Sequence, residues 1–94
     1  MTEEEKQLGE YRIALRRKEN IREHTLLNDE IKVIAEGIQS LGKQLLVNPE
    51  YSFDVQAANT GLLSLPEKQS RCGALSTQIA EDTKKLKGTV FLDS

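Results

Sequence analysis

Few residues in this sequence could take part in covalent or metal chemistry. The chain has one histidine, His24, and one cysteine, Cys72. A thiolate and an imidazole can act together as nucleophile and base, but Cys72 falls on the apolar face of an expected helix. A zinc site needs three or four thiolate, imidazole or carboxylate ligands at suitable spacing, and the sequence offers no such set. Glycine-rich phosphate loops and nucleotide-binding fingerprints are also absent. We therefore expect no enzymatic activity, no metal and no cofactor.

A stronger chemical signal is a cluster of basic residues near the N-terminus, which neighbouring glutamates partly balance. Guanidinium groups match the geometry of phosphate and carboxylate, and Tyr11 offers a ring on which a base could stack. The simpler interpretation is a solvated helix face with ion pairs four residues apart. Phe91, in the C-terminal tail, is a further apolar candidate. The candidates for binding a partner protein or an anion are Tyr11, Arg12, Arg16, Arg17, Lys18, Arg22 and Phe91.

The composition indicates one small domain, residues 1–94, with an aliphatic core. Charged residues make up 30% of the chain and aromatic residues only 4%, and the net charge of -2 is too small to imply a polyionic partner. The N-terminal sequence is acidic, unlike a signal peptide, and no apolar run approaches the roughly 20 residues of a membrane span. We expect a cytoplasmic protein with no membrane partner, in agreement with its single cysteine.

The remaining elements must pack against residues 26–47, which carry the longest apolar stripe. With its flanks, this apolar arc covers about 200° of the helix, twice the roughly 100° of a typical surface helix. Gly37 and Gly42 lie on those flanks, where each costs roughly 1 kcal/mol relative to alanine. They allow a neighbouring backbone to approach closely, or are simply tolerated. The stripe consists of Leu27, Ile31, Ile34, Ile38, Leu41 and Leu45, at steps of four and three.

A helix over residues 3–24 is expected to precede this central helix. Thr2 and Glu5 form a capping-box pattern. A single helix over residues 3–47 would be about 67 Å long, more than a domain of this size can bury. We therefore expect a bend or break near residues 24–28.

After Pro49, which ends the central helix, the spacing of apolar residues predicts a short helix over 49–60. A brief extended segment is the alternative there. A second capping box with Pro66 in the first turn predicts another helix over 65–87, and Gly88 is a typical stop signal. The tail, residues 89–94, folds back on the hairpin or docks to a partner.

These patterns predict an all-α protein, in which an antiparallel helical hairpin and the N-terminal helix form a small three- or four-helix bundle. We expect it to self-associate as a homo-oligomer. The function expected first is non-enzymatic binding of another protein, as an inhibitor, adaptor or assembly factor. An alternative is an oligomer that sequesters a phosphate-bearing small molecule or nucleotide through Tyr11 and the arginines. Nucleic-acid binding by the same basic helix is third.

Overall fold

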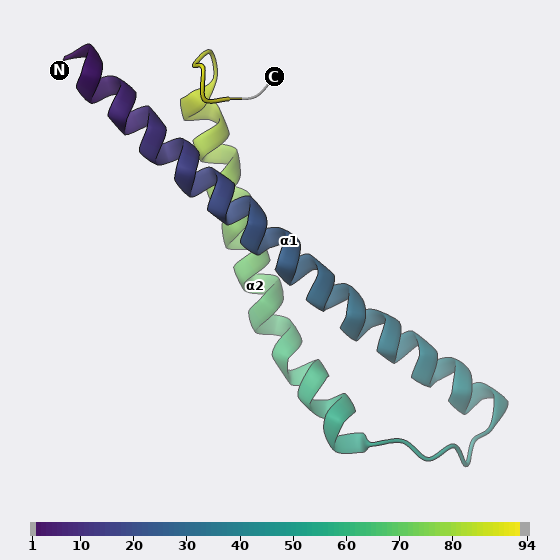
Figure 1. Ribbon diagram of the computed structural model, residues 1–94. Helices are drawn as coiled ribbons and strands as arrows, with labels where there is room; N and C mark the ends of the chain where they lie inside the picture. The colour runs from purple at the N-terminus through teal and green to yellow at the C-terminus, as the bar shows by residue number, and fades with distance from the viewer. Residues whose placement is uncertain (1, 93–94) are drawn as a thin grey trace.

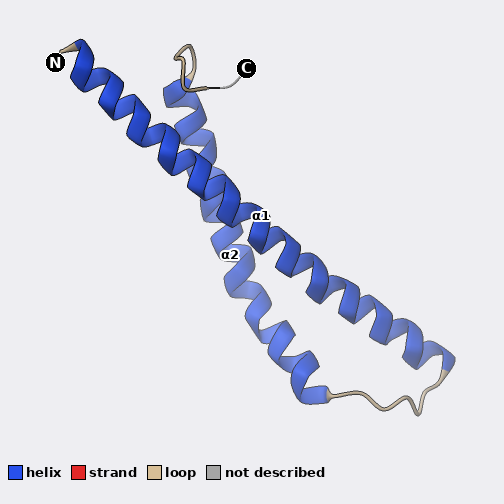
Figure 2. Cartoon of the chain, in the orientation of Figure 1, coloured by secondary structure: helices blue, strands red, loops and turns tan. Residues whose placement is uncertain are grey.

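The chain forms an extended hairpin of two long antiparallel helices (Figure 1). The computed structural model describes residues 2–92; helix α1 spans Glu3–Val47 and helix α2 spans Val55–Leu86. The hairpin measures 70 × 23 × 14 Å, so it is about one helix thick. Figure 2 shows only helix and loop over residues 2–92. The all-α hairpin is therefore confirmed, whereas the three- or four-helix bundle within one chain is wrong, because residues 2–92 contain two helices.

Helix α1 is continuous, so the predicted break near residues 24–28 is wrong. Its start is as expected, because the backbone N–H of Glu5 donates to Thr2 Oγ1 at 3.2 Å. Thr25 lies in this stretch and is of a residue type that often caps a helix start, but its hydroxyl donates to the carbonyl of Ile21, one turn earlier. No proline interrupts residues 3–47. The length argument fails because α1 has no fully buried residue, so its length is not limited by a core.

Helix α2 joins two segments that the sequence patterns separate. It begins at the N-cap Asp54, whose carboxylate accepts the N–H of Ala57 at 3.0 Å. The short helix over 49–60 and the helix start near residue 65 are therefore both wrong. Pro66 lies inside α2, where it lacks the N–H that would bond to the preceding turn. The predicted stop is confirmed, since α2 ends at Leu86 and Gly88 has a φ of 84°.

Very little of the hairpin is fully buried. Leu75 is 2% exposed, and Leu86 and Asp82 are completely covered; all three belong to the C-terminal part of α2. The α1 stripe is half-buried, except for Ile38, which is exposed. A single neighbouring helix therefore covers only part of the wide apolar arc of α1. No helix within residues 2–92 is long and apolar enough to cross a membrane.

Candidate functional site

A row of polar contacts joins the two helices in the half of the hairpin that carries the chain termini. We call this row the polar seam. Arg16 of α1 binds Asp82 of α2 through Nε to Oδ2 at 3.0 Å and Nη2 to Oδ1 at 2.6 Å. Glu23 pairs with Arg71, and Glu30 with Lys68, each at 2.8 Å. The three α1 residues are seven apart and therefore lie on one face. The seam fixes the antiparallel register of the hairpin.

Asp82 is the most completely enclosed polar group of the seam. Besides Arg16, it accepts a hydrogen bond from Gln78 Nε2 at 3.0 Å. The bond from Arg16 lowers the pKa of Asp82, and burial opposes that shift. The same bond raises the pKa of Arg16, whose side chain is 49% exposed. Asp82 has no exposed surface, although the hairpin is only 14 Å thick.

Two further contacts join the helices along the seam, and in each the group from α2 is a hydroxyl. Arg17 Nε donates to Thr83 Oγ1 at 2.9 Å. His24 Nε2 and Ser76 Oγ lie 3.0 Å apart, within hydrogen-bond distance. His24 is thus bonded to a serine of α2, and Cys72 is a half-buried free thiol elsewhere on α2.

The seam ends at Glu30 and Lys68, and glycines occupy the next position. Between the Arg16–Asp82 and Glu30–Lys68 pairs, both helices advance by the same fourteen residues. Seven residues further toward the loop from the last pair lie Gly37 on α1 and Gly61 on α2. A Cβ at Gly37 would meet nothing within 4 Å, and one at Gly61 would only touch Ile34 at 4.0 Å. Neither glycine therefore brings a side chain of its own into the space between the helices.

An apolar groove opens beyond the last ion pair, and Gly37 and Gly61 both line it. It has a volume of about 470 Å³ and lies between α1, the loop and the first turns of α2. We call it the tip groove, and we call residues 33–65 around it the tip. The groove is lined by the small residues Gly37, Ser40, Ala57, Ala58 and Gly61 and by the apolar residues Val33, Ile34, Ile38, Leu41, Phe53 and Leu62, with Gln44, Tyr51 and Asp54 among its polar members.

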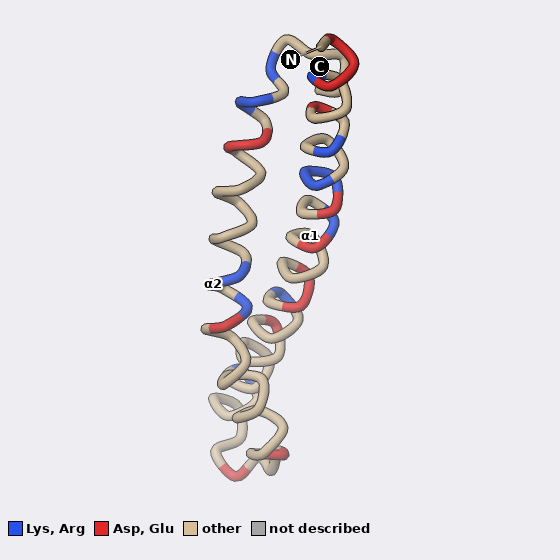
Figure 3. Tube along the Cα trace, turned by 90° about the vertical axis from the view of Figure 1, so that its left-hand side faces the viewer, with Lys and Arg blue, Asp and Glu red and all other residues tan. Residues whose placement is uncertain are grey.

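The tip is also the part of the hairpin with the fewest charges (Figure 3). Residues 33–65 include only Glu36, Lys43, Glu50 and Asp54 as charged residues. Asp54 lines the groove, but its carboxylate is already engaged as the cap of α2. An apolar surface with so few charges has the composition of the core of a protein interface, where charged residues are depleted.

The residues predicted from the sequence to bind a partner or an anion do not form one site. Arg16 and Arg17 point to α2 and belong to the polar seam. Tyr11 packs on Phe91 of the tail, with ring centroids 6.1 Å apart and planes tilted by 58°. The tail thus folds back on α1 as far as residue 92, whereas residues 93–94 lie outside the described part. The other three candidates, Arg12, Lys18 and Arg22, are exposed.

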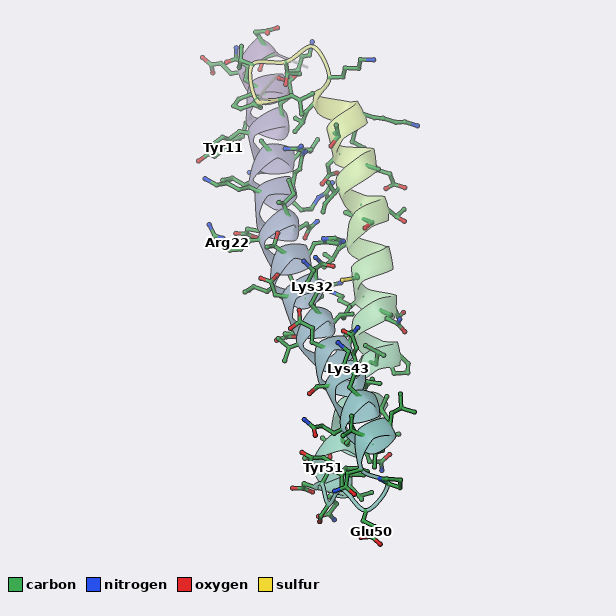
Figure 4. All side chains as sticks on the ribbon, turned by 90° about the vertical axis from the view of Figure 1, so that its right-hand side faces the viewer. Tyr11, Arg22, Lys32, Lys43, Glu50 and Tyr51 are labelled. Atoms are coloured by element: carbon green, nitrogen blue, oxygen red, sulfur yellow. The ribbon has the colours of Figure 1, made fainter. Side chains whose placement is uncertain are left out.

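Figure 4 shows Arg22 pointing away from α2, and it places Tyr11 at the opposite end of the hairpin from Tyr51 and Glu50. The tip groove is therefore remote from every predicted site residue. Sequence reasoning missed it, although one signal was available. The seven-residue spacing of Arg16, Glu23 and Glu30 continues to Gly37, but the residue opposite each position becomes known only once α2 is placed.

Comparisons with known proteins identify no matching family model, no matching curated protein and no matching solved structure. Within residues 2–92, no group of three or more histidine, cysteine, aspartate or glutamate residues is arranged to hold a metal ion.

Proposed function

We propose that this chain is a non-enzymatic protein-binding module that takes an α-helix of its partner into the tip groove. The observation that carries this proposal is an apolar, charge-poor groove at the end of the hairpin, which residues 2–92 leave open. Binding of an amphipathic helix in an apolar groove is a common mode of protein recognition. By covering that helix, the chain would modulate its partner as an inhibitor, adaptor or assembly factor.

The exposed side chains around the groove favour a protein over a small molecule. Leu46 is 87% exposed, Leu63 72% and Val33 68%. Leu46 and Leu63 do not line the groove, so a ligand filling the groove would leave them in water. A helix extends over several turns and can cover such neighbours. Burying each of these side chains contributes about 1.5–3 kcal/mol, so a large contact is favoured over a small one.

The nucleotide-sequestering and nucleic-acid-binding alternatives receive less support. Both relied on several arginines and Tyr11 acting together. Arg16 and Arg17 are engaged with α2, and the ring of Tyr11 packs against Phe91. An anion would have to compete with Asp82 for the guanidinium of Arg16. The exposed Arg12, Lys18 and Arg22 remain as a solvated face.

Site-specific photocrosslinking tests the proposal. A benzophenone amino acid is placed at Val33, on the groove, and at Lys18, on the exposed face of the same helix. The full-length variants are irradiated in the cells from which the protein comes, and the adducts are identified by mass spectrometry. We expect a protein adduct from position 33 and none from position 18. The reverse pattern would move the site to the basic face, and no adduct at either position would contradict protein binding.

A further inference from the structure

We infer that the helix that occupies the tip groove belongs to a second copy of this chain, so that two hairpins dimerise tip to tip. This inference rests on the proposed function and names its partner. In the dimer, the groove-lining face of residues 33–47 of one copy, which excludes Gly42, lies against the groove of the other, related by a two-fold axis. The polar halves of the two hairpins then point in opposite directions.

The first argument is that the tip cannot form a core within one chain. The two buried apolar residues, Leu75 and Leu86, both lie outside the tip, and residues 33–65 contain no fully buried residue. Helices in proteins gain most of their stability from packing an apolar face. Every copy of the chain lacks a buried core in its tip. A second copy is the one partner that is always present with the first.

The second argument is that the tip carries both halves of a complementary surface. It offers a groove lined by small residues such as Gly37 and Gly61, and it offers exposed apolar side chains outside the groove, such as Leu46 and Leu63. A two-fold interface requires the same patch to be self-complementary. Small residues let helices approach closely, and the apolar side chains of one copy then fill the groove of the other. The low number of tip charges keeps repulsion between the copies small.

The third argument is size. Residues 33–47 extend for about 22 Å at 1.5 Å per residue, and the hairpin is 23 Å wide. The tip face therefore has a projected area of about 500 Å². Its accessible surface area is larger than this, because side chains make the surface uneven. A stable interface needs about 800 Å² per partner. The tip face is thus of the right order for a dimer.

The dimer has a shape that distinguishes it from other assemblies. Two hairpins 70 Å long that overlap by about 22 Å have centres about 48 Å apart. Because each hairpin has a radius of gyration of 20.2 Å, the radius of gyration of this dimer is about 31 Å. A side-by-side dimer, with centres about 14 Å apart, would have a radius of gyration of about 21 Å. Small-angle scattering separates these two values.

Two glycine variants test the groove itself. Gly37 and Gly42 are both exposed positions of α1 where a Cβ meets nothing within 4 Å, but only Gly37 lines the groove. Glutamine is a better helix former than glycine, so neither Gly37→Gln nor Gly42→Gln should unfold the hairpin. In sedimentation equilibrium and native mass spectrometry of the full chain, we expect wild-type dimers. Gly37→Gln should raise the dimer dissociation constant at least tenfold, and Gly42→Gln should leave it unchanged.

Several results would overturn the inference. They are a monomer at all concentrations up to about 100 μM, a radius of gyration near that of the side-by-side dimer, or equal effects of the two glycine variants. Retention of a small apolar molecule by a monomer would assign the groove to a ligand. A monomer that still crosslinks to another protein from position 33 would refute self-association and leave the proposed function standing.

Discussion

Replacing Asp82 by asparagine tests whether the polar seam holds the hairpin together. The substitution keeps the shape of the side chain and removes its charge. The amide nitrogen of asparagine donates and cannot accept, so the variant loses one of the two bonds from Arg16, at 3.0 and 2.6 Å, keeps the other without its negative charge, and changes the contact with Gln78. Breaking a fully buried ion pair costs about 3–5 kcal/mol. Because the Arg16 side chain is 49% exposed and regains water, we expect a smaller loss of about 2 kcal/mol, within the range of hydrogen bonds to charged groups.

The assay is urea unfolding followed by circular dichroism at a fixed protein concentration. The matched control is Glu30→Gln, which removes the charge from another seam pair whose carboxylate is 54% exposed. Exposed ion pairs contribute about 0–1 kcal/mol, so the control should lower the free energy of unfolding by less than about 0.5 kcal/mol. If both variants lose the same amount, or if Asp82→Asn is neutral, enclosure of Asp82 does not stabilise the hairpin and the reasoning is refuted.

Three further predictions concern the same helices. The pKa of Asp82 is lowered in the folded state, so the stabilisation that its charge provides is complete above the ordinary carboxyl pKa of about 4 and is lost as the pH falls through the folded-state pKa. As the pH is lowered, the urea midpoint of Asp82→Asn should therefore fall less steeply than that of the wild type. Leu75→Ala, at a position 2% exposed, should cost about 2–3 kcal/mol of unfolding free energy, whereas Leu63→Ala, at a position 72% exposed, should cost little in the monomer; equal losses in urea unfolding of dilute protein would contradict the burial pattern. Gly42→Ala should raise the thermal midpoint, since the added Cβ meets nothing and alanine favours the helix by about 1 kcal/mol, and an unchanged or lower midpoint in a calorimetric scan would count against an open, helical position for Gly42.

The sequence by itself determined the helical nature of this protein and several helix ends. The six stripe residues define an α-helix because their steps of three and four exist on one face only in that conformation. Thr2 and Gly88 mark a helix start and a helix end because capping depends on residues within one turn. These features are local, so neighbouring residues decide them without reference to the rest of the fold.

The tertiary structure alone decided where the helices are interrupted and which surface remains uncovered. Thr25 and Pro66 resemble helix boundaries in the sequence, yet both lie inside helices, because their neighbours can continue the helix on either side. Arg16 could have faced solvent or an anion, and only the placement of Asp82 across the hairpin engages it. The tip groove depends on Gly37 of α1 and Gly61 of α2 lining the same space. Such pairings join residues far apart in the chain, and they are set by the packing of α1 on α2.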